Sequence, residues 1–505
     1  MFNDILLYMI FSTGRSKPLK ILFVASEAGP YVKVGGLGEV MYSLPRALDR
    51  IGHDARVIIP RYASIDMEKH PMEMVLEGLS VPSGNGDPLI CNIKRADKAY
   101  FLENQEFYEK RASVYGYDDD AARWALLSRG TLEFIRNYKD WRPDIIVACD
   151  WQGGLLPNYK QRDYKDDPIL SMIPIVFSIH NLYYQGMFDH KFIPEMDYDD
   201  GQSEIPSFAN PRLLKINFMR RGIMHADIIN TVSPTYAQEI TTQEYGELLD
   251  SLLGERRSKL FGILNGIDYV SNDPESDTKI EFQFSKKHLD ERLKNKNVLR
   301  HRFNLPIPEP DREDPAILGM VTRLSEQKGL DLVMDVIESI LETTGSQFII
   351  VGTGDPKYMG FFSELDQKYA NVTAHLSYDD VLPHLVYAGA DIILVPSKYE
   401  PCGLTQMEAM RYGAIPIVRK TGGLADSVQN FDPKSDKGDG FVFDKYNNFS
   451  FFSACIRAIE AYRYPKVWQG IQKRAMSANF SWDKSATEYV KLFNKAMNFL
   501  SQSSD

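Results

Sequence analysis

The feature that most constrains the fold of this chain is a repeated alternation between short apolar runs and longer amphipathic stretches. Each run is rich in Val and Ile, ends in turn residues and is followed by a stretch with helical periodicity. Buried strands with helices between them are typical of a parallel α/β sheet. In the first part of the chain we expect such strands at residues 21–25, 56–59, 144–148, 174–179 and 227–232.

A break in this pattern divides the chain. Residues 304–315 read NLPIPEPDREDP, with four prolines and five charged residues, which is typical of an extended, solvated connection. The α/β pattern then resumes, with strands expected at residues 316–321, 347–351, 391–396 and 415–418. Two such sheets in one chain predict an α/β fold of two doubly wound, Rossmann-like domains that face a cleft.

Composition limits the partners of the protein. The 505 residues carry 58 Lys and Arg against 69 Asp and Glu, a formal charge of −11, so we expect neither nucleic acid nor membrane as a partner. No stretch approaches the ~20 apolar residues of a membrane span, and residues 1–18 are expected to form a tail. The four cysteines form no C-x-x-C pair, which favours a reducing compartment: the cytoplasm, or the plastid stroma in a plant or alga. None of these features determines the oligomeric state.

A glycine-rich connection follows the first expected strand. It reads GPYVKVGGLGEV and leads into a helix expected at residues 37–50, so Lys33, Gly35 and Gly36 lie where a strand turns into a helix. Glycines let a ligand approach the backbone, exposed N–H groups and the helix dipole favour an anion, and Lys33 adds a positive charge. We therefore expect a phosphate group to bind at this connection, although a purely structural glycine turn is the alternative.

Two cations follow the first strand of the second sheet. Arg323 and Lys328 lie in TRLSEQKGL, directly after the strand expected at residues 316–321. An Arg fork and a Lys point charge can clamp a diphosphate whose negative charge grows as a bond breaks. A solvated pair at a sheet edge is the alternative, and these residues alone leave both readings open.

The most specific stretch is residues 391–426, in which a buried strand, a loop and a helix follow one another. Glu400 lies in the loop, and Glu408 lies on the helix expected from about residue 403. A carboxylate can accept hydrogen bonds from two vicinal hydroxyls, so this arrangement suits a polyol. Backbone N–H groups of two glycine turns can take phosphate or sugar oxygens; they belong to Cys402, Gly403, Leu404, Thr421, Gly422 and Gly423.

Two other motifs are disfavoured. A dinucleotide fingerprint requires G-x-G-x-x-G, whereas VGGLGEV spaces its glycines differently and the GTGD at residues 352–355 is too short, so a dehydrogenase is not indicated. The D-x-D at residues 118–120 could suggest a metal-dependent transferase. It precedes a helical stretch at residues 121–135, however, and we interpret it as an N-cap cluster rather than a metal site.

Nine motifs in a fixed order give the chain a resemblance to a known family. From about Lys20 to Tyr489 it resembles the glycogen and starch synthase family of retaining glucosyltransferases. The motifs are KVGGLGEV, YGYDDDAARWALLSRG, HNLYYQG, TVSPTYAQEI, LNGID, MVTRLSEQKGLDL, VGTGDP, EPCGLTQMEAMRYG and RKTGGLAD.

The resemblance implies a GT-B type fold made of two Rossmann-like domains. A first domain at residues 19–305 would bind the glucan acceptor, and a second at residues 306–482 would bind most of the nucleotide-sugar donor. A C-terminal helix at residues 483–505 would pack back on the first domain, and residues 485–500 do place apolar side chains on one helical face. The family implies neither a metal nor another cofactor.

The resemblance also implies roles for residues that interact with the donor. Lys33, with Gly35 and Gly36, would contact its phosphate and sugar, while Arg323 and Lys328 would neutralise the diphosphate. The remaining implied substrate-binding residues are Asn181, Asn265, Cys402, Gly403, Leu404, Thr421 and Gly422.

Three residues are implied to act close to the sugar. Glu400 would hold the hydroxyls of the transferred glucose, and Glu408 a ribose or a nearby group. His180 would stand near the C6 hydroxyl of the glucose, with its backbone carbonyl near the anomeric carbon.

The chain departs from the family pattern at several positions. Where the family usually has HDWH, residues 149–152 read CDWQ, so the histidines flanking Asp150 are absent, although we still expect Asp150 in the catalytic site. Glu39 stands where Asp is common, and Ser271 begins a replacement of the usual aromatic-Asn-Pro after NGID. These changes concern the geometry of the acceptor and the base of the donor more than the reaction.

Together these features predict an enzyme that transfers glucose from ADP-glucose to the non-reducing end of an α-1,4-glucan or maltooligosaccharide, with retention of configuration. UDP-glucose is the alternative donor. A second hypothesis is a non-catalytic glucan-binding or initiation partner of the same fold. A third is another nucleotide-sugar enzyme, of the sucrose or trehalose synthase type. Whether the enzyme primes new chains or only extends them stays open.

Overall fold

The structure is a computed structural model that describes residues 17–84, 86–188, 199–309 and 313–502. The expected tail at residues 1–18 lies outside the described residues, apart from its last two. The described chain divides into two compact units. Unit 1 comprises the described residues up to 177, residues 186–227 and the residues from 492 onward, and unit 2 comprises residues 178–185 and 228–491. The domain borders expected from the sequence remain predictions.

Among the described residues, the first sheet has nine strands in the order β3-β4-β5-β2-β1-β6-β7-β8-β9. Strand β1 pairs in parallel with β2 and β6, whereas β3, β4 and β5 form antiparallel pairs. The chain order reverses between β1 and β6, which is where ligands bind in doubly wound sheets. The strands are β1 (Lys20–Val24), β2 (Asp54–Pro60), β3 (Glu73–Val81), β4 (Leu89–Ala96), β5 (Ala99–Glu103), β6 (Ile145–Cys149), β7 (Ile175–Ile179), β8 (Ile228–Thr231) and β9 (Leu260–Gly262).

The second sheet has six described strands, all paired in parallel, in the order β12-β11-β10-β13-β14-β15. This is the doubly wound order, with its reversal between β10 and β13. Every residue of β11, β13 and β14 is buried, and most of these residues are Val, Ile or Leu, as expected of strands that are covered on both faces. The strands are β10 (Ile317–Val321), β11 (Gln347–Val351), β12 (Val372–His375), β13 (Ile392–Val395), β14 (Ile415–Arg419) and β15 (Phe441–Phe443).

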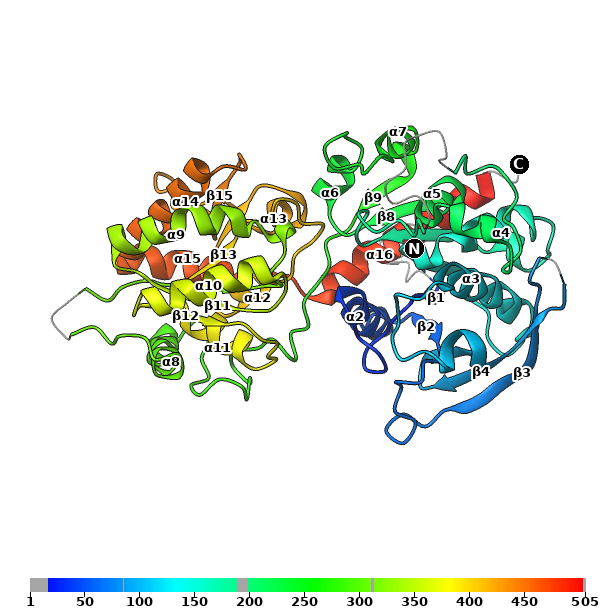
Figure 1. Ribbon diagram of the computed structural model, residues 1–505, viewed down its shortest axis with the longest axis horizontal. Helices are drawn as coiled ribbons and strands as arrows, with labels where there is room; N and C mark the ends of the chain where they lie inside the picture. Colours follow the sequence, from blue (N-terminus) through cyan, green and yellow to red (C-terminus); the bar gives the residue numbers. More distant parts are fainter. Residues whose placement is uncertain (1–16, 85, 189–198, 310–312, 503–505) are drawn as a thin grey trace, which may run out of the picture. The chain divides into compact units, whose positions relative to one another are not determined.

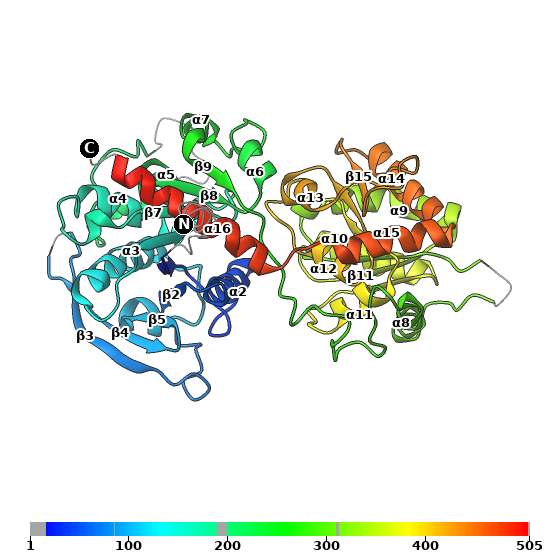
Figure 2. The ribbon, with the colours of Figure 1, turned by 180° about the vertical axis from the view of Figure 1, so that it is seen from behind.

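Helices flank this second sheet on both sides, with α9 and α14 toward the top of both views and α8 and α11 toward the bottom (Figures 1 and 2). The α-helices of the described chain are α2 (Gly36–Arg50), α3 (Asp120–Asn137), α4 (Leu155–Arg162), α5 (Phe218–His225), α6 (Pro234–Glu239), α7 (Asp250–Glu255), α8 (Leu289–Arg302), α9 (Leu330–Thr344), α10 (Pro356–Lys368), α11 (Leu382–Gly389), α12 (Thr405–Arg411), α13 (Gly422–Ser427), α14 (Asn448–Tyr462), α15 (Pro465–Ser477) and α16 (Trp482–Gln502). None of the described helices is both long enough and apolar enough to cross a membrane.

The terminal helix α16 docks on the first sheet, as expected. Its inner face buries Ala486, Tyr489, Phe493 and Ala496. The Tyr489 hydroxyl accepts a hydrogen bond of 3.0 Å from the side-chain amide of Asn230 on strand β8. The expected α/β architecture of two doubly wound sheets with a returning helix is therefore confirmed.

Candidate active site

The glycine-rich connection after β1 is organised by a carboxylate that the sequence reasoning did not single out. Glu27 is 2% exposed and accepts hydrogen bonds from the backbone N–H of Val34 and, at 3.0 Å, from that of Gly35. These are N–H groups of the turn that was predicted to bind a phosphate. Glu27 follows a buried strand at the switch point of the sheet, which is the one signal that could have identified it.

Lys33 lies at the surface of the same connection. Its ammonium group is 2.8 Å from the Glu39 carboxylate, and 57% of its side chain is exposed. A Cβ atom added at Gly36 would meet no atom within 4 Å, whereas one at Gly38 would lie 3.1 Å from the Cα of Lys33. A side chain at Gly38 would therefore be tightly packed against Lys33, whereas the space beside Gly36 is open to a ligand.

Asp150 follows strand β6, the other strand at the switch point of the first sheet. Its φ angle of 51° is in the left-handed region, which costs a non-glycine residue about 1–3 kcal/mol and is common at functional sites. Its neighbours in the CDWQ departure, Cys149 and Gln152, are both buried. Burial also raises the pKa of the Cys149 thiol well above its usual value. The two positions at which the family usually has a histidine are therefore packed in the interior of this protein.

The sequence cluster at residues 118–120 forms ion pairs with arginines of its own unit. Asp120 is 5% exposed and lies 2.5 Å from the Arg123 guanidinium, and Asp119 pairs with Arg111. Asp119 occupies the N-cap position of α3, but its side chain makes no capping hydrogen bond. The predicted location of this cluster at a helix start is correct, although the Asp119 carboxylate pairs with Arg111 rather than with a backbone N–H of the helix. No group of three or more His, Cys, Asp or Glu in the described residues is arranged to hold a metal ion.

In unit 2, Lys328 and Glu400 form a largely buried ion pair at the switch point between β10 and β13. The Lys328 ammonium lies 2.6 Å from the Glu400 carboxylate, with 21% and 7% of the two side chains exposed. The Ser397 hydroxyl donates a second hydrogen bond of 2.9 Å to the same carboxylate oxygen. A small cavity of about 30 Å³ opens beside this group, so the carboxylate is held in a fixed orientation at the wall of a hollow.

Arg323 lines a larger cavity, of about 760 Å³, in the same unit. Its guanidinium is exposed and has no hydrogen-bond partner among the described residues. Six tyrosines contribute to the wall, including Tyr183 and Tyr399, whose rings stack with their centroids 6.4 Å apart. A free guanidinium beside aromatic rings suits a ligand that combines an anionic group with a flat ring.

The turn at Thr421 and Gly422 packs against the Glu400 loop. A Cβ atom at Gly422, whose φ is 42°, would lie only 2.0 Å from the carbonyl oxygen of Glu400. In this structure Glu239 accepts hydrogen bonds from the Gly422 N–H at 3.0 Å and from the Thr421 hydroxyl at 2.9 Å. A carboxylate therefore occupies donors that were predicted for a phosphate or sugar oxygen, and burial raises the pKa of this Glu239 carboxyl.

Asn265 lies beside Cys402. The structure thus brings together two residues that were both predicted to bind the substrate. Burial raises the pKa of the Cys402 thiol to about 12, opposed by a backbone hydrogen bond from Asn265. The side-chain oxygen of Asn265 is buried without a hydrogen-bond partner among the described residues. Such an unsatisfied acceptor is costly unless a ligand supplies the donor, for example a hydroxyl group.

Three other predicted residues lie in the connections that follow strands or at the start of the next helix. His180 and Asn181 follow β7; the His180 imidazole lies 3.3 Å from the Ser178 hydroxyl, and the Asn181 side chain accepts from the Tyr183 N–H at 3.1 Å. Glu408 lies in the first turn of α12, where the buried Tyr387 hydroxyl bonds to it. The structure thus places predicted site residues at the carboxyl ends of strands in each sheet.

Family profiles match both parts of the chain. The profile described as "Starch synthase catalytic domain" matches residues 20–255, and that described as "Glycosyl transferases group 1" matches residues 302–471. With the two doubly wound sheets, these matches define the chain as a glycosyltransferase of the GT-B type.

Relatives of nearly full length then identify the family. The glycogen synthase of Thermotoga petrophila is 39% identical over 490 residues, which cover 95% of this chain and 99% of that protein. The glycogen synthase of Bacillus anthracis is 39% identical over 486 residues, covering 95% and 100%. The chain belongs to the glycogen and starch synthase family, as its motifs predicted.

Solved structures agree with this assignment. The catalytic domain of starch synthase IV from Arabidopsis thaliana, solved with ADP and acarbose bound, matches with a TM-score of 0.81 and 32% identity over 95% of this chain and 100% of that one. A sucrose-phosphate synthase from Thermosynechococcus elongatus, at 16% identity and a TM-score of 0.57 over 94% of this chain and 98% of that one, shares the fold alone. The comparisons therefore favour the glycogen and starch synthase function over both alternatives.

Proposed function

We propose that the protein transfers glucose from ADP-glucose to the non-reducing end of an α-1,4-glucan, with retention of configuration at the anomeric carbon. The single observation that carries this proposal is the arrangement at the switch point of the second sheet. There the fixed Glu400 carboxylate, its partner Lys328 and the unpaired Arg323 guanidinium follow the ends of β10 and β13. A carboxylate that can accept hydrogen bonds from sugar hydroxyls, with two cations beside it, suits a sugar attached to a diphosphate.

Each charged group has a defined part in the proposed reaction. Glu400 would accept hydrogen bonds from the glucose hydroxyls and so hold the sugar. Arg323 and Lys328 would stabilise the negative charge that develops on the diphosphate as its bond to the sugar breaks. The family resemblance assigns Lys33 to the phosphate of the donor as well. The exposed Lys33 can turn from Glu39 toward a phosphate at small cost, because exposed ion pairs contribute at most about 1 kcal/mol.

The proposed chemical step is a displacement on one face of the sugar. The bond between the anomeric carbon and the diphosphate oxygen breaks, and a bond to the acceptor hydroxyl oxygen forms on the same side. The acceptor's proton passes to the departing phosphate, so no enzyme nucleophile is required. Unoccupied acceptors such as the buried Asn265 oxygen would receive hydrogen bonds from ligand hydroxyls.

The decisive experiment measures glucose transfer from ADP-glucose to maltooligosaccharides in excess EDTA. We expect full activity, because side-chain cations would supply the charge that a divalent ion provides in other transferases. We also expect products that an α-1,4-specific amylase digests. Parallel reactions with UDP-glucose, and with no primer, determine the donor and whether the enzyme starts new chains.

Each outcome has a separate meaning. Loss of activity in EDTA with recovery in manganese would contradict the metal-free mechanism. A strong preference for UDP-glucose would change the donor only, and β-linked products would contradict retention. Glucan binding without nucleotide release under any condition would favour the non-catalytic partner. The cytoplasmic location stays a prediction.

A further inference from the structure

We propose that Asp277 is a positioning residue for the nucleotide donor, because it fixes the helix that carries Glu408. The inference rests on the proposed function, since it takes Glu408 as the carboxylate that holds the ribose of the donor. Asp277 lies in the connection that follows LNGID, and 4% of its side chain is exposed. No motif of the sequence singled it out.

The Asp277 carboxylate joins three segments of unit 2. One of its oxygens, Oδ2, accepts a hydrogen bond of 2.6 Å from the hydroxyl of Tyr412, the residue directly after α12. The same oxygen lies 2.7 Å from Nδ1 of His384 on α11. The other oxygen, Oδ1, accepts from the backbone N–H of Lys279 at 2.8 Å. These contacts tie the connection at residues 277–279 to both helices.

The second nitrogen of His384 determines how this network is protonated. Nε2 lies 3.1 Å from the ammonium group of Lys279. An ammonium group can only donate, so Nε2 is the acceptor and the imidazole is neutral, with its proton on Nδ1 and directed to Asp277. Burial raises the pKa of the Asp277 carboxyl, but hydrogen bonds from Tyr412, Lys279 and His384 outweigh it and lower this pKa below its usual value. Asp277 is therefore a carboxylate whose two oxygens both receive donors.

Helix α12 is too short to hold its own direction. It has seven residues, fewer than the ~12–15 that an isolated helix needs in water, so its ends depend on outside contacts. The N–H of Tyr412 closes the last turn by donating to the carbonyl of Glu408 at 3.2 Å. Tyr412 is fully buried, and burial raises the pKa of its hydroxyl, which therefore keeps its proton and donates to Asp277. Anchoring this hydroxyl fixes the end of the helix.

The same two helices orient Glu408. It lies four residues before Tyr412, on the same face of α12. The hydroxyl of Tyr387, a 3% exposed residue of α11, bonds to the Glu408 carboxylate. The rings of Tyr387 and Tyr412 lie with their centroids 6.3 Å apart. Asp277 therefore holds the contact between α11 and α12 on which the direction of the Glu408 side chain depends.

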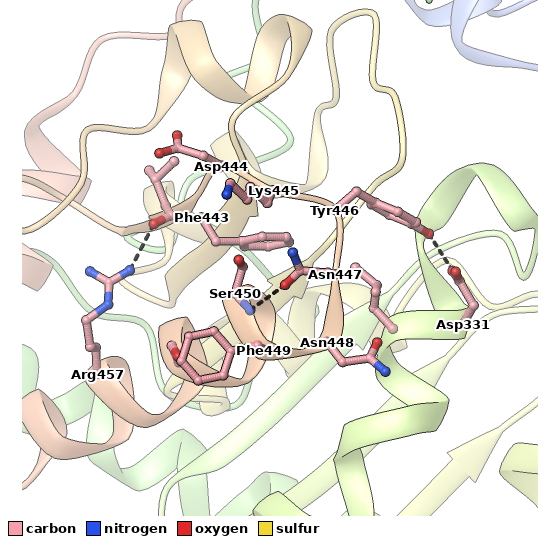
Figure 3. A pocket seen from close by; sticks show the side chains of 13 residues that line it. Asp331, Phe443, Asp444, Lys445, Tyr446, Asn447, Asn448, Phe449, Ser450 and Arg457 are labelled. Atoms are coloured by element: carbon pink, nitrogen blue, oxygen red, sulfur yellow. Dashed lines mark hydrogen bonds between the residues drawn. The ribbon is translucent and has the colours of Figure 1, made fainter.

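Two other aspartates provide matched controls. Asp273 belongs to the same connection and pairs at 2.8 Å with Arg411, the last residue of α12, but 27% and 20% of the two side chains are exposed. Water and salt screen such a pair, so its loss should leave α12 in place. Asp444 lines a hollow of about 920 Å³ beside β15, with 76% of its side chain exposed (Figure 3). Its substitution controls for the loss of one negative charge in unit 2.

The test measures donor binding in single variants. Initial rates at varied ADP-glucose and varied maltooligosaccharide give KM and kcat, and calorimetry gives the Kd of ADP. We expect Asp277→Asn to raise the donor KM and the Kd of ADP about tenfold, because an amide nitrogen would face a donor that the carboxylate accepts. Tyr412→Phe removes only the hydroxyl and should raise both about threefold. In both variants kcat and the acceptor KM should stay at the parental values, as should all constants in Asp273→Asn and Asp444→Asn.

A double variant separates positioning from a general loss of structure. Glu408→Gln alone should weaken ADP binding, and adding Asp277→Asn should weaken it no further, since Asp277 acts through Glu408. A merely structural role would lower the melting temperature and leave the Kd of ADP for the folded protein unchanged. The double variant is measured by calorimetry at a temperature at which every variant is folded.

Several results would overturn the inference. Parental ADP affinity in Asp277→Asn and Tyr412→Phe would do so, as would full additivity of Asp277→Asn with Glu408→Gln, or an equal loss in Asp273→Asn. If Asp277→Asn does not fold, Tyr412→Phe carries the same test. Failure of the proposed function is distinguishable, because calorimetry requires no glucose transfer. A parent protein that does not bind ADP would contradict the proposed donor, and the same variants are then measured with UDP.

Discussion

The connection after β1 and the connection after β10 each carry a lysine that forms an ion pair with a glutamate, and the two ion pairs differ in their exposure. In unit 1 the pair Lys33 and Glu39 is exposed, with 57% and 28% of the side chains accessible. In unit 2 the pair Lys328 and Glu400 is largely buried and tied to Ser397. An exposed lysine can move to a ligand and contributes little to folding, whereas a buried pair is oriented in advance and leaves an uncompensated charge if one partner is lost.

The glycines of the two regions differ in the same sense. The space where a side chain at Gly36 would begin is empty, while that at Gly422 is filled by the carbonyl of Glu400. The first region therefore has room for a ligand in the described structure, and the second is a packed support for the carboxylate. We therefore expect substitutions in the first region to change activity without a loss of stability, and substitutions in the second region to lower both.

The largest expected effect tests the cations for their role in the reaction. Lys33→Ala and Arg323→Ala should each lower kcat by about 10²- to 10³-fold, because each removes one positive charge that would stabilise the leaving group. Neither should lower the free energy of unfolding appreciably, since both side chains are exposed. The control is Lys368→Ala, which breaks an exposed ion pair with Glu338. Parental rates in the first two variants would remove these residues from the site.

Two glycine variants test whether the open space at Gly36 serves a ligand and whether the packing at Gly422 supports the Glu400 loop. Gly422→Ala should lower the free energy of unfolding by about 2–4 kcal/mol, because a methyl group overlaps the backbone of the Glu400 loop and the residue has a left-handed conformation. Gly36→Ala should keep or slightly raise stability at the start of α2, yet lower turnover about tenfold by filling the ligand's space. Denaturant titration and initial rates measure both quantities. Equal losses of stability in the two variants would show that Gly36 and Gly422 do not differ as their surroundings indicate.

The buried pair allows stability and catalysis to be measured on the same residues. Lys328→Ala should reduce the free energy of unfolding by about 1–3 kcal/mol, because it leaves the Glu400 carboxylate buried without its cation. Adding Glu400→Gln to this variant should restore part of that stability but none of the turnover. If Lys328→Ala unfolds at the same denaturant concentration as Lys33→Ala, the two pairs do not differ as their burial implies.

The smallest expected effect concerns the sugar contact. Glu400→Gln keeps the shape of the side chain but replaces a charge-assisted hydrogen bond worth about 1.5–3 kcal/mol by a neutral one, so kcat/KM should fall about tenfold or more. The matched variant is Glu39→Gln, whose carboxylate pairs with a lysine at the surface and should matter less. An unchanged kcat/KM in Glu400→Gln would exclude a role for this carboxylate in holding glucose.

The sequence by itself determined the strands that are buried on both faces, since their unbroken apolar runs have no other stable environment. The predicted run at residues 347–351 coincides with β11, and the run at residues 174–179 contains β7. Strand β3 was not predicted, because seven of its nine residues are partly or fully exposed and only Leu79 and Val81 are buried. A strand of this kind is stabilised by pairing with β4 rather than by its own composition.

The sequence also located the site residues that follow strands, because parallel strands bring their carboxyl ends to one edge and place Arg323, Lys328 and Glu400 there together. Only the tertiary structure decided which carboxylates take the backbone donors of the glycine turns. Glu239 reaches the N–H of Gly422 across 183 positions of the chain, and Glu27 turns back onto Gly35. Such contacts depend on how connections from different strands meet, and no local pattern of residues specifies that meeting.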